Sequence, residues 1–236
     1  MTRKRQADAA GIVGASGSGY PLSAKLENRC DLVIANGAEC EPLLYSDSTL
    51  IERHARQVIE GLSLAMDAVG AHRGILAIRQ GERAALEAAH DAARGISHIE
   101  VTPLPDIYPI GDAHLLVHAL TGRVLPEGGH AEAAGVLVSN VHTLWHLARS
   151  AEFPVTWRYV SVGGDVAWPQ VLRVPTGMPI GDLLALCGGT QVQEPVFLLG
   201  GPMQGEVIHD AEHPLDKRHG GLFVFDGAHP LLQRRL

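Results

Sequence analysis

A glycine-rich segment near the amino terminus, residues 11–26, contains the residue types best suited to binding a phosphate group. It reads Gly-Ile-Val-Gly-Ala-Ser-Gly-Ser-Gly-Tyr-Pro-Leu-Ser-Ala-Lys-Leu. Glycine costs roughly 0.5–1 kcal/mol relative to alanine inside a helix or strand, so four glycines within nine residues predict a loop. Open backbone N–H groups in such a loop, followed by a helix start and Lys25, suit a phosphate.

A second polar segment, residues 36–42, begins ten residues later and reads Asn-Gly-Ala-Glu-Cys-Glu-Pro. It directly follows the apolar run Asp-Leu-Val-Ile-Ala, which is typical of a short buried strand. An amide and two carboxylates at a strand end, close in sequence to an anion-binding loop, predict a ligand site that both segments build.

The glycine-rich loop does not match the two common nucleotide-binding motifs. No strand precedes it, as the dinucleotide fingerprint requires, and its lysine is not where a triphosphate-binding loop needs one. Two other interpretations stay open: Ser16 as a nucleophile assisted by an Asp and a His elsewhere, and a flexible linker.

The composition narrows the class of protein. The 236-residue chain is 46% hydrophobic with a net charge of −7, which predicts a packed core and argues against a nucleic-acid partner. No apolar run approaches the ~20 residues that span a bilayer, and no secretory leader is recognisable. The three cysteines, Cys30, Cys40 and Cys187, are too widely spaced for an iron–sulfur cluster or zinc. We therefore expect no metal and a cytoplasmic protein.

Strand and helix patterns alternate through the first two thirds of the chain. Strands are expected at 31–35, 74–79, 98–103 and 134–139, and helices at 47–69, 82–93, 113–120 and 141–148. This alternation predicts a parallel sheet covered by helices. Asn140 lies between an expected strand and helix, where open α/β sheets bind ligands.

From residue 154 onward the elements become short and are separated by glycine and proline. Strands are expected at 159–163, 164–167, 171–174 and 196–199, with a helix at 179–186. This order predicts a compact α+β unit with ubiquitin-like topology, so we expect one domain over residues 1–153 and a second over 154–236. Residues 3–5, Arg-Lys-Arg, are expected to form a solvated tail, and residues 230–236 a loose tail.

Five segments together resemble the core of the RnfC family. That core is shared with the cobalamin reductases of propanediol utilisation and with the FMN-binding subunit of respiratory complex I. The resemblance covers about residues 11–225 and rests on residues 11–26 and 36–42, on 108–111 with 119–123, on 139–144 and on 200–205. Residues 160–189 are similar to a soluble-ligand-binding β-grasp (SLBB) domain.

This resemblance implies a Rossmann-like parallel-sheet FMN domain followed by a smaller ubiquitin-like β-grasp domain. FMN is the implied cofactor, with NADH as a candidate electron donor. The implied cofactor residues are Gly14, Ser16, Gly17, Ser18, Gly19, Lys25, Asn36, Glu39, Glu41, Asn140 and Thr143. Lys25 would neutralise the phosphate, and Tyr20 with Gly111 would contact a substrate such as the nicotinamide ring.

The chain departs from the family pattern in three ways. The iron–sulfur cysteines and the amino-terminal barrel-like domain of RnfC are missing, so we expect no cluster in this chain. The family's Tyr-Pro-x-Gly-Gly-Glu run reads Tyr-Pro-Ile-Gly-Asp-Ala here, with Ala113 in place of the glutamate and Asp112 one residue earlier. The use of NADH is therefore left open.

Three functions fit these observations. The first is an FMN oxidoreductase, either diaphorase-like or an electron-transfer subunit that hands electrons to a separate redox partner protein. The second is a stand-alone flavoenzyme acting on a small organic substrate. Its acid–base candidates would be Glu39, Glu41, Asp112 and His142. The third is a non-enzymatic ligand-binding protein with a relic flavin site. A homo-oligomer is compatible with each.

Overall fold

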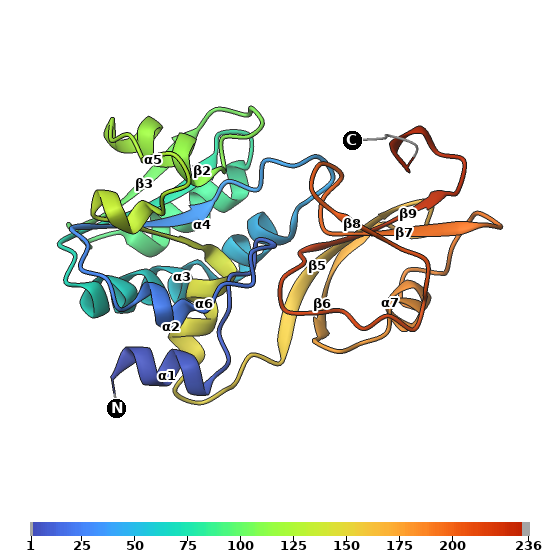
Figure 1. The fold of residues 1–236 in the computed structure, drawn as a ribbon, viewed down its shortest axis with the longest axis horizontal. Helices are drawn as coiled ribbons and strands as arrows, with labels where there is room; N and C mark the ends of the chain where they lie inside the picture. The colour runs from blue at the N-terminus through green and yellow to red at the C-terminus, as the bar shows by residue number, and fades with distance from the viewer. Residues whose placement is uncertain (1, 233–236) are drawn as a thin grey trace.

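Four parallel strands in the order β3-β2-β1-β4 form the first sheet (Figure 1). The structure is a computed structural model and describes residues 2–232. The strands are β1 (Leu32–Gly37), β2 (Arg73–Arg79), β3 (Ile99–Leu104) and β4 (Val136–Asn140). Each pairs in parallel with its neighbour. The predicted parallel sheet is therefore confirmed, with boundaries shifted by one or two residues.

Helices cover both faces of this sheet, because its strands present apolar side chains alternately to either side. One face packs against α3 (Ser46–Val69), α4 (Arg83–Ala93) and α6 (Val141–Arg149). The other face packs against α5 (Ala113–Thr121) and the 3₁₀ helix η1 (Ala131–Ala134). Two short amino-terminal helices, α1 (Arg3–Ala9) and α2 (Leu22–Lys25), add to the first layer. Residues 3–5 are exposed, as expected, but they begin α1 and do not form a tail.

The second sheet has five strands in the order β6-β5-β9-β7-β8. They are β5 (Trp157–Gly164), β6 (Gln170–Pro175), β7 (Pro195–Leu199), β8 (Glu206–Ile208) and β9 (Gly221–Asp226). Strands β5 and β9 pair in parallel and the other pairs are antiparallel. The helix α7 (Ile180–Ala185) packs on one face of this sheet. This arrangement confirms the predicted second α+β unit.

Several predicted details of the second unit were wrong. The strand expected at 164–167 is absent, because Gly164 ends β5 with φ 78° and only Val166 forms an isolated bridge with Thr190. Strands β8 and β9 were not predicted. Of the expected tail, Pro230–Leu232 forms the 3₁₀ helix η2, and residues 233–236 lie outside the described residues.

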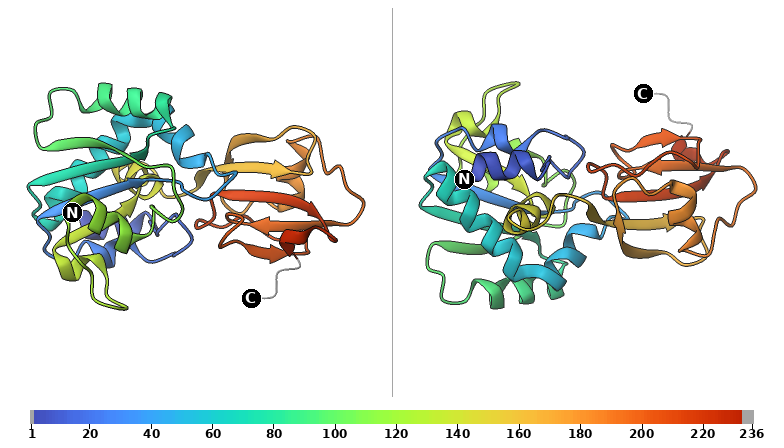
Figure 2. Two further views of the ribbon diagram at one scale, coloured as in Figure 1. Left: turned by 90° about the horizontal axis from the view of Figure 1, so that it is seen from above. Right: turned by 90° about the horizontal axis from the view of Figure 1, so that it is seen from below.

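The two sheets lie side by side, joined by the segment between α6 and β5 (Figure 2). Helices α3 and α6 both begin at the edge of the first sheet where β1 and β4 end. The domain boundary expected between residues 153 and 154 falls within this joining segment and stays a prediction. Within residues 2–232, no helix combines the length and apolar character needed to cross a membrane.

Candidate functional site

A cavity of about 810 Å³ lies at the carboxyl edge of β1 and β4 and is closed from the opposite side by the second domain. Most of the predicted site residues line it. They are Gly14, Ser16, Gly17, Ser18, Tyr20, Lys25, Asn36, Glu39, Glu41, Gly111, Asp112, Asn140 and Thr143. Gly19 and His142 are not among the lining residues.

Two asparagines at neighbouring strand ends form the floor of this cavity. Asn36 and Asn140 are register partners on β1 and β4. The side-chain oxygen of each accepts the backbone N–H two residues further along, at 3.0 Å and 2.8 Å. The Nδ2 of Asn36 donates to the carbonyl of Gly111 at 2.9 Å, and that of Asn140 donates to Asp47 Oδ2 at 2.7 Å. Each amide keeps one N–H without a partner in the described structure, so the floor offers hydrogen-bond donors.

Glu39 is buried beside this floor, at the start of α3. Its carboxylate accepts hydrogen bonds from the backbone N–H and hydroxyl of Ser46, at 3.1 Å and 2.7 Å, and from the backbone N–H of Asp47 at 2.9 Å. Burial and the neighbouring Asp47 carboxylate raise the pKa of Glu39 to about 8. Glu39 can therefore hold a proton near neutral pH.

His142 lies beneath the floor and is 1% exposed. Its Nδ1 is 2.7 Å from Asp47 Oδ1. Burial lowers the pKa of His142 against the opposing effect of Asp47, which favours a neutral ring whose Nδ1–H donates to the carboxylate. Its Nε2 is buried without a partner in the described structure.

Lys25 ends the short helix α2 and is the cation that lines the cavity from the first domain. Its Nζ donates to the carbonyl of Val138 at 2.8 Å, on the outer edge of β4. Burial lowers the pKa of Lys25, and the Glu132 carboxylate opposes this shift. Within the described residues Glu132 forms no ion pair with Lys25, so an anionic group in the cavity would find the ammonium group available as a partner.

The glycine-rich loop uses most of its own N–H groups to hold its shape. Those of Gly14, Ala15, Gly17, Gly19 and Tyr20 donate to protein acceptors. The Ala15 bond goes to Thr143 Oγ1, and that hydroxyl also donates to the carbonyl of Val13, so Thr143 ties the loop to α6. In the described structure the backbone N–H groups of Ser16 and Ser18 have no protein acceptor, so they are available to bind an anion.

Residues 7–149 match the family model described as the Nuo51 FMN-binding domain, and residues 159–207 match the SLBB domain. The first match covers more than half of the chain. This chain belongs to the Nuo51-type FMN-binding family.

Curated relatives extend this family assignment over almost the whole chain. It is 40% identical over 230 residues to the cobalamin reductase PduS of Salmonella typhimurium, covering 97% of this chain and 51% of that protein. It is 36% identical over 220 residues to one subunit of the Na⁺-translocating ferredoxin:NAD⁺ oxidoreductase complex of Acetobacterium woodii, covering 90% of this chain and 50% of the relative. The chain thus spans about half the length of the curated relatives it matches.

A solved structure with the same fold is a NAD⁺-reducing [NiFe]-hydrogenase in the air-oxidised state. The TM-score is 0.79 at 25% sequence identity, covering 96% of this chain and 47% of the hydrogenase chain. The FMN-binding fold and its attached SLBB domain are therefore shared across these oxidoreductases.

In this member of the Nuo51-type family, Glu41 connects the two domains. Its Oε2 accepts the backbone N–H of Met203 at 2.8 Å and that of Gln204 at 3.3 Å. A Cβ on Gly201 would collide with the Glu41 carboxylate, so only glycine permits this close approach. The Glu41 carboxylate thus holds the loop of the second domain over the cavity.

The remaining predicted residues lie at the mouth of the cavity. Asp112 is exposed, and its Oδ1 caps α5 by accepting the N–H groups of His114 and Leu115 at 2.9 Å and 3.4 Å. Tyr20 is 46% exposed and stacks against His130, with the ring centroids 6.1 Å apart. Two aromatic rings beside the mouth suit a planar ligand.

Asp47, Arg158 and His130 were missed as site residues. An acidic residue in the first turn of a long helix is usually explained by its favourable interaction with the helix dipole. The sequence alone therefore did not indicate that Asp47 belongs to the site. Arg158 comes from β5 of the second domain and is 2% exposed. Its Nη2 lies 3.5 Å from the carbonyl of Ala15, and burial lowers its pKa to about 10. No sequence pattern places a residue so distant beside the glycine-rich loop.

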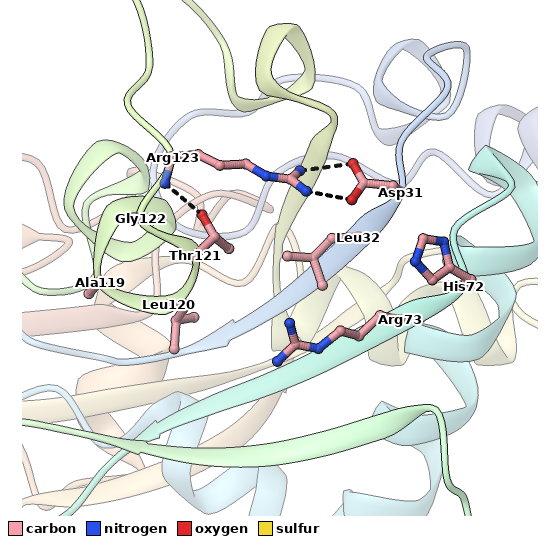
Figure 3. A pocket seen from close by; sticks show the side chains of 9 residues that line it. All are labelled: Asp31, Leu32, His72, Arg73, Ala119, Leu120, Thr121, Gly122 and Arg123. Atoms are coloured by element: carbon pink, nitrogen blue, oxygen red, sulfur yellow. Dashed lines mark hydrogen bonds and ion pairs between the residues drawn. The ribbon is translucent and has the colours of Figure 1, made fainter.

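A second cavity, of about 430 Å³, lies at the opposite, amino-terminal edge of the first sheet (Figure 3). Its charged side chains are already paired. Arg123 forms two bonds with Asp31, at 2.8 Å and 2.5 Å, and Arg73 pairs with Glu100 at 2.8 Å. Because ligands of open α/β sheets bind at the carboxyl edge, we do not assign a function to this cavity. In the described part of the chain, no group of three His, Cys, Asp or Glu side chains could hold a metal.

Proposed function

We propose that this chain binds FMN in the large cavity and passes electrons between a reduced donor and a separate partner. The observation that carries the proposal is the combination of a donor-lined floor, Asn36 and Asn140, with a cation, Lys25, that forms no ion pair within the described residues. An oxidised flavin ring presents carbonyl and ring-nitrogen acceptors, and its phosphate needs a cation and open N–H groups. The cavity volume also falls within the ~300–1,000 Å³ usual for ligand pockets.

Each part of the cavity has a role in this proposal. Bound FMN would supply the redox chemistry, while the protein supplies binding, orientation and electrostatic tuning. The floor asparagines would orient the ring, and Lys25 with the N–H groups of Ser16 and Ser18 would hold the phosphate. The Glu39 carboxyl, with its pKa raised to about 8, would hold a proton beside the ring.

NADH is our candidate for the donor. The names of two similar proteins, the Acetobacterium woodii complex and the hydrogenase, both include NAD⁺. The exposed pair of Tyr20 and His130 gives the cavity mouth a flat aromatic surface against which a nicotinamide could stack. Asp112, which caps a helix here, would serve as a fixed acceptor at the same mouth rather than as a mobile proton carrier.

We propose a redox protein as the partner, since the Acetobacterium woodii relative is by name part of a complex. We place the activity in the cytoplasm. The cysteines Cys30, Cys40 and Cys187 are all free thiols, which is in keeping with a reducing compartment.

Titration of the FMN-free protein with FMN, followed by flavin fluorescence, tests the proposal. The wild-type chain should bind FMN, and Lys25→Ala should weaken binding about 10- to 100-fold, because a hydrogen bond to a charged group contributes about 1.5–3 kcal/mol. Lys4→Ala, which removes an exposed lysine paired with Glu27, is the matched control and should bind like wild type.

The outcomes separate the parts of the proposal. A wild-type protein that takes up no FMN would refute the function as a whole. Unchanged affinity in Lys25→Ala would refute only the phosphate assignment. NADH added without oxygen should bleach the flavin absorbance of the loaded protein, and a flavin that stays oxidised would exclude NADH as the donor.

A further inference from the structure

Asp47 contacts Asn140, His142 and Glu39 at once. It is the second residue of α3 and is 8% exposed. Its Oδ2 accepts from Asn140 Nδ2 at 2.7 Å, and its Oδ1 accepts from His142 Nδ1 at 2.7 Å. Its backbone N–H donates to Glu39 Oε2 at 2.9 Å. Through its carboxylate Asp47 therefore holds Asn140 and the His142 ring, and through its backbone N–H it holds the Glu39 carboxyl group.

This contact determines which way the Asn140 amide faces. An asparagine side chain can rotate by 180° and exchange its oxygen and nitrogen, so its orientation follows from its partners. An ionised carboxylate only accepts hydrogen bonds, and it must therefore face the NH₂ of Asn140. With the Asn140 oxygen held by the His142 backbone N–H, the second amide N–H is left for the cavity.

Burying a carboxylate costs free energy unless donors and positive charges compensate. Asp47 has two side-chain donors, and it lies in the first turn of α3, where the helix dipole favours a negative charge. Arg158 of the second domain is the other buried charge nearby. Among the acids that oppose the burial-induced lowering of the Arg158 pKa, Asp47 has the largest effect. The surroundings of Asp47 thus suit a side chain that accepts hydrogen bonds.

We propose that Asp47 is the positioning residue of the flavin site. It fixes the Asn140 amide so that the floor offers an N–H donor, and it thereby selects ligands whose ring edge carries acceptors, as the oxidised flavin does. This inference rests on the proposed binding of FMN in the cavity. Asp47 itself does not need to touch the ligand.

Three variants separate positioning from a merely structural role. Asp47→Asn replaces one acceptor with an NH₂ group. This group faces the NH₂ of Asn140, or it forces the His142 proton from Nδ1 to Nε2, where a buried N–H would have no partner in the described structure. The double variant Asp47→Asn with Asn140→Asp restores all three hydrogen bonds and reverses only the one between residues 47 and 140, because the new amide can donate to the new carboxylate and accept from His142. That carboxylate can still cap α6, but the floor now offers an acceptor in place of a donor. Asp67→Asn, at an exposed site on the same helix, is the control.

Thermal unfolding and the FMN dissociation constant are measured for each variant, alongside wild type. Asp47→Asn should lose both stability and FMN affinity, the latter at least tenfold. The double variant should regain most of the thermal stability while its FMN affinity stays at least tenfold below wild type. Asp67→Asn should match wild type in both measurements.

Two results would overturn the inference while leaving FMN binding intact. One is wild-type affinity in Asp47→Asn. The other is full recovery of affinity in the double variant, which would show that the polarity of the floor does not matter. If wild type and Asp67→Asn themselves fail to bind FMN, the proposed function fails and this inference fails with it.

Discussion

Replacing Glu39 with glutamine should change how the stability of the FMN-free chain depends on pH. Burial and Asp47 raise the folded-state pKa of Glu39 to about 8, above the ordinary value of 4.5. A carboxyl whose pKa is raised on folding binds its proton more tightly in the folded state. Its contribution is therefore fully present below about pH 4.5 and is lost as the pH rises towards 8. At 1.36 kcal/mol per pKa unit, the loss amounts to about 4–5 kcal/mol.

Urea unfolding at about pH 5, 7 and 9 measures this effect as a difference between wild type and Glu39→Gln. At the lowest pH the variant should be less stable by about 1–3 kcal/mol, because its NH₂ group faces N–H donors of Ser46 or Asp47. At the highest pH the order should reverse, since glutamine carries no buried charge. Taking the difference cancels the titration of other groups.

The control is Glu87→Gln, an exposed carboxylate on α4. The difference in unfolding free energy between Glu87→Gln and wild type should be the same at all three pH values. If the difference between Glu39→Gln and wild type were also constant with pH, the reasoning would be refuted, because the Glu39 carboxyl would then have the same proton affinity in the folded and unfolded chain.

Two further substitutions test the contact between the domains and the choice of cavity. Gly201→Ala should weaken FMN binding several-fold, because its Cβ would push the Glu41 carboxylate aside and break its hydrogen bonds to Met203 and Gln204. Combining it with Glu41→Ala should add little further loss, because the same hydrogen bonds are already broken, and an additive loss would contradict this cause. Arg123→Met should leave FMN affinity within about twofold of wild type and cost about 0–1 kcal/mol of stability, as expected for a partly exposed ion pair. A large loss of affinity would mean that the amino-terminal cavity takes part in binding.

The first sheet could be predicted from the sequence because its signal is local. Apolar runs such as Val33-Ile34-Ala35 alternate with helices that have a regular apolar face, and this alternation is enough to predict a parallel sheet. In the second domain the signals are shorter. Strand β8 has three residues and depends on pairing with β7, so nothing in its own sequence marks it. The Gly164–Ala167 strand failed because a positive φ at Gly164 ends β5 there.

The candidate site likewise contains residues that can be predicted from the sequence and residues that cannot. Residues at strand ends, such as Asn36 and Asn140, can be found from the order of strands and turns alone. Asp47 and Arg158 cannot, because their roles depend on contacts with residues 93 and 143 positions away in the chain. A sequence shows that Asp47 is acidic and lies near a helix start, whereas only the fold shows which two donors it faces.

The glycine-rich loop illustrates how tertiary contacts change the meaning of a composition. The N–H of Gly17 is used by the carbonyl of Arg218, and a Cβ on Gly19 would come within 2.7 Å of the Arg218 side chain. These two glycines therefore allow the second domain to lie close to the loop, in addition to any role in binding a phosphate. Fewer N–H groups are left for an anion than the glycine count suggests. Lys25 must then contribute a larger share of the binding free energy than it would in a loop whose amides were all open.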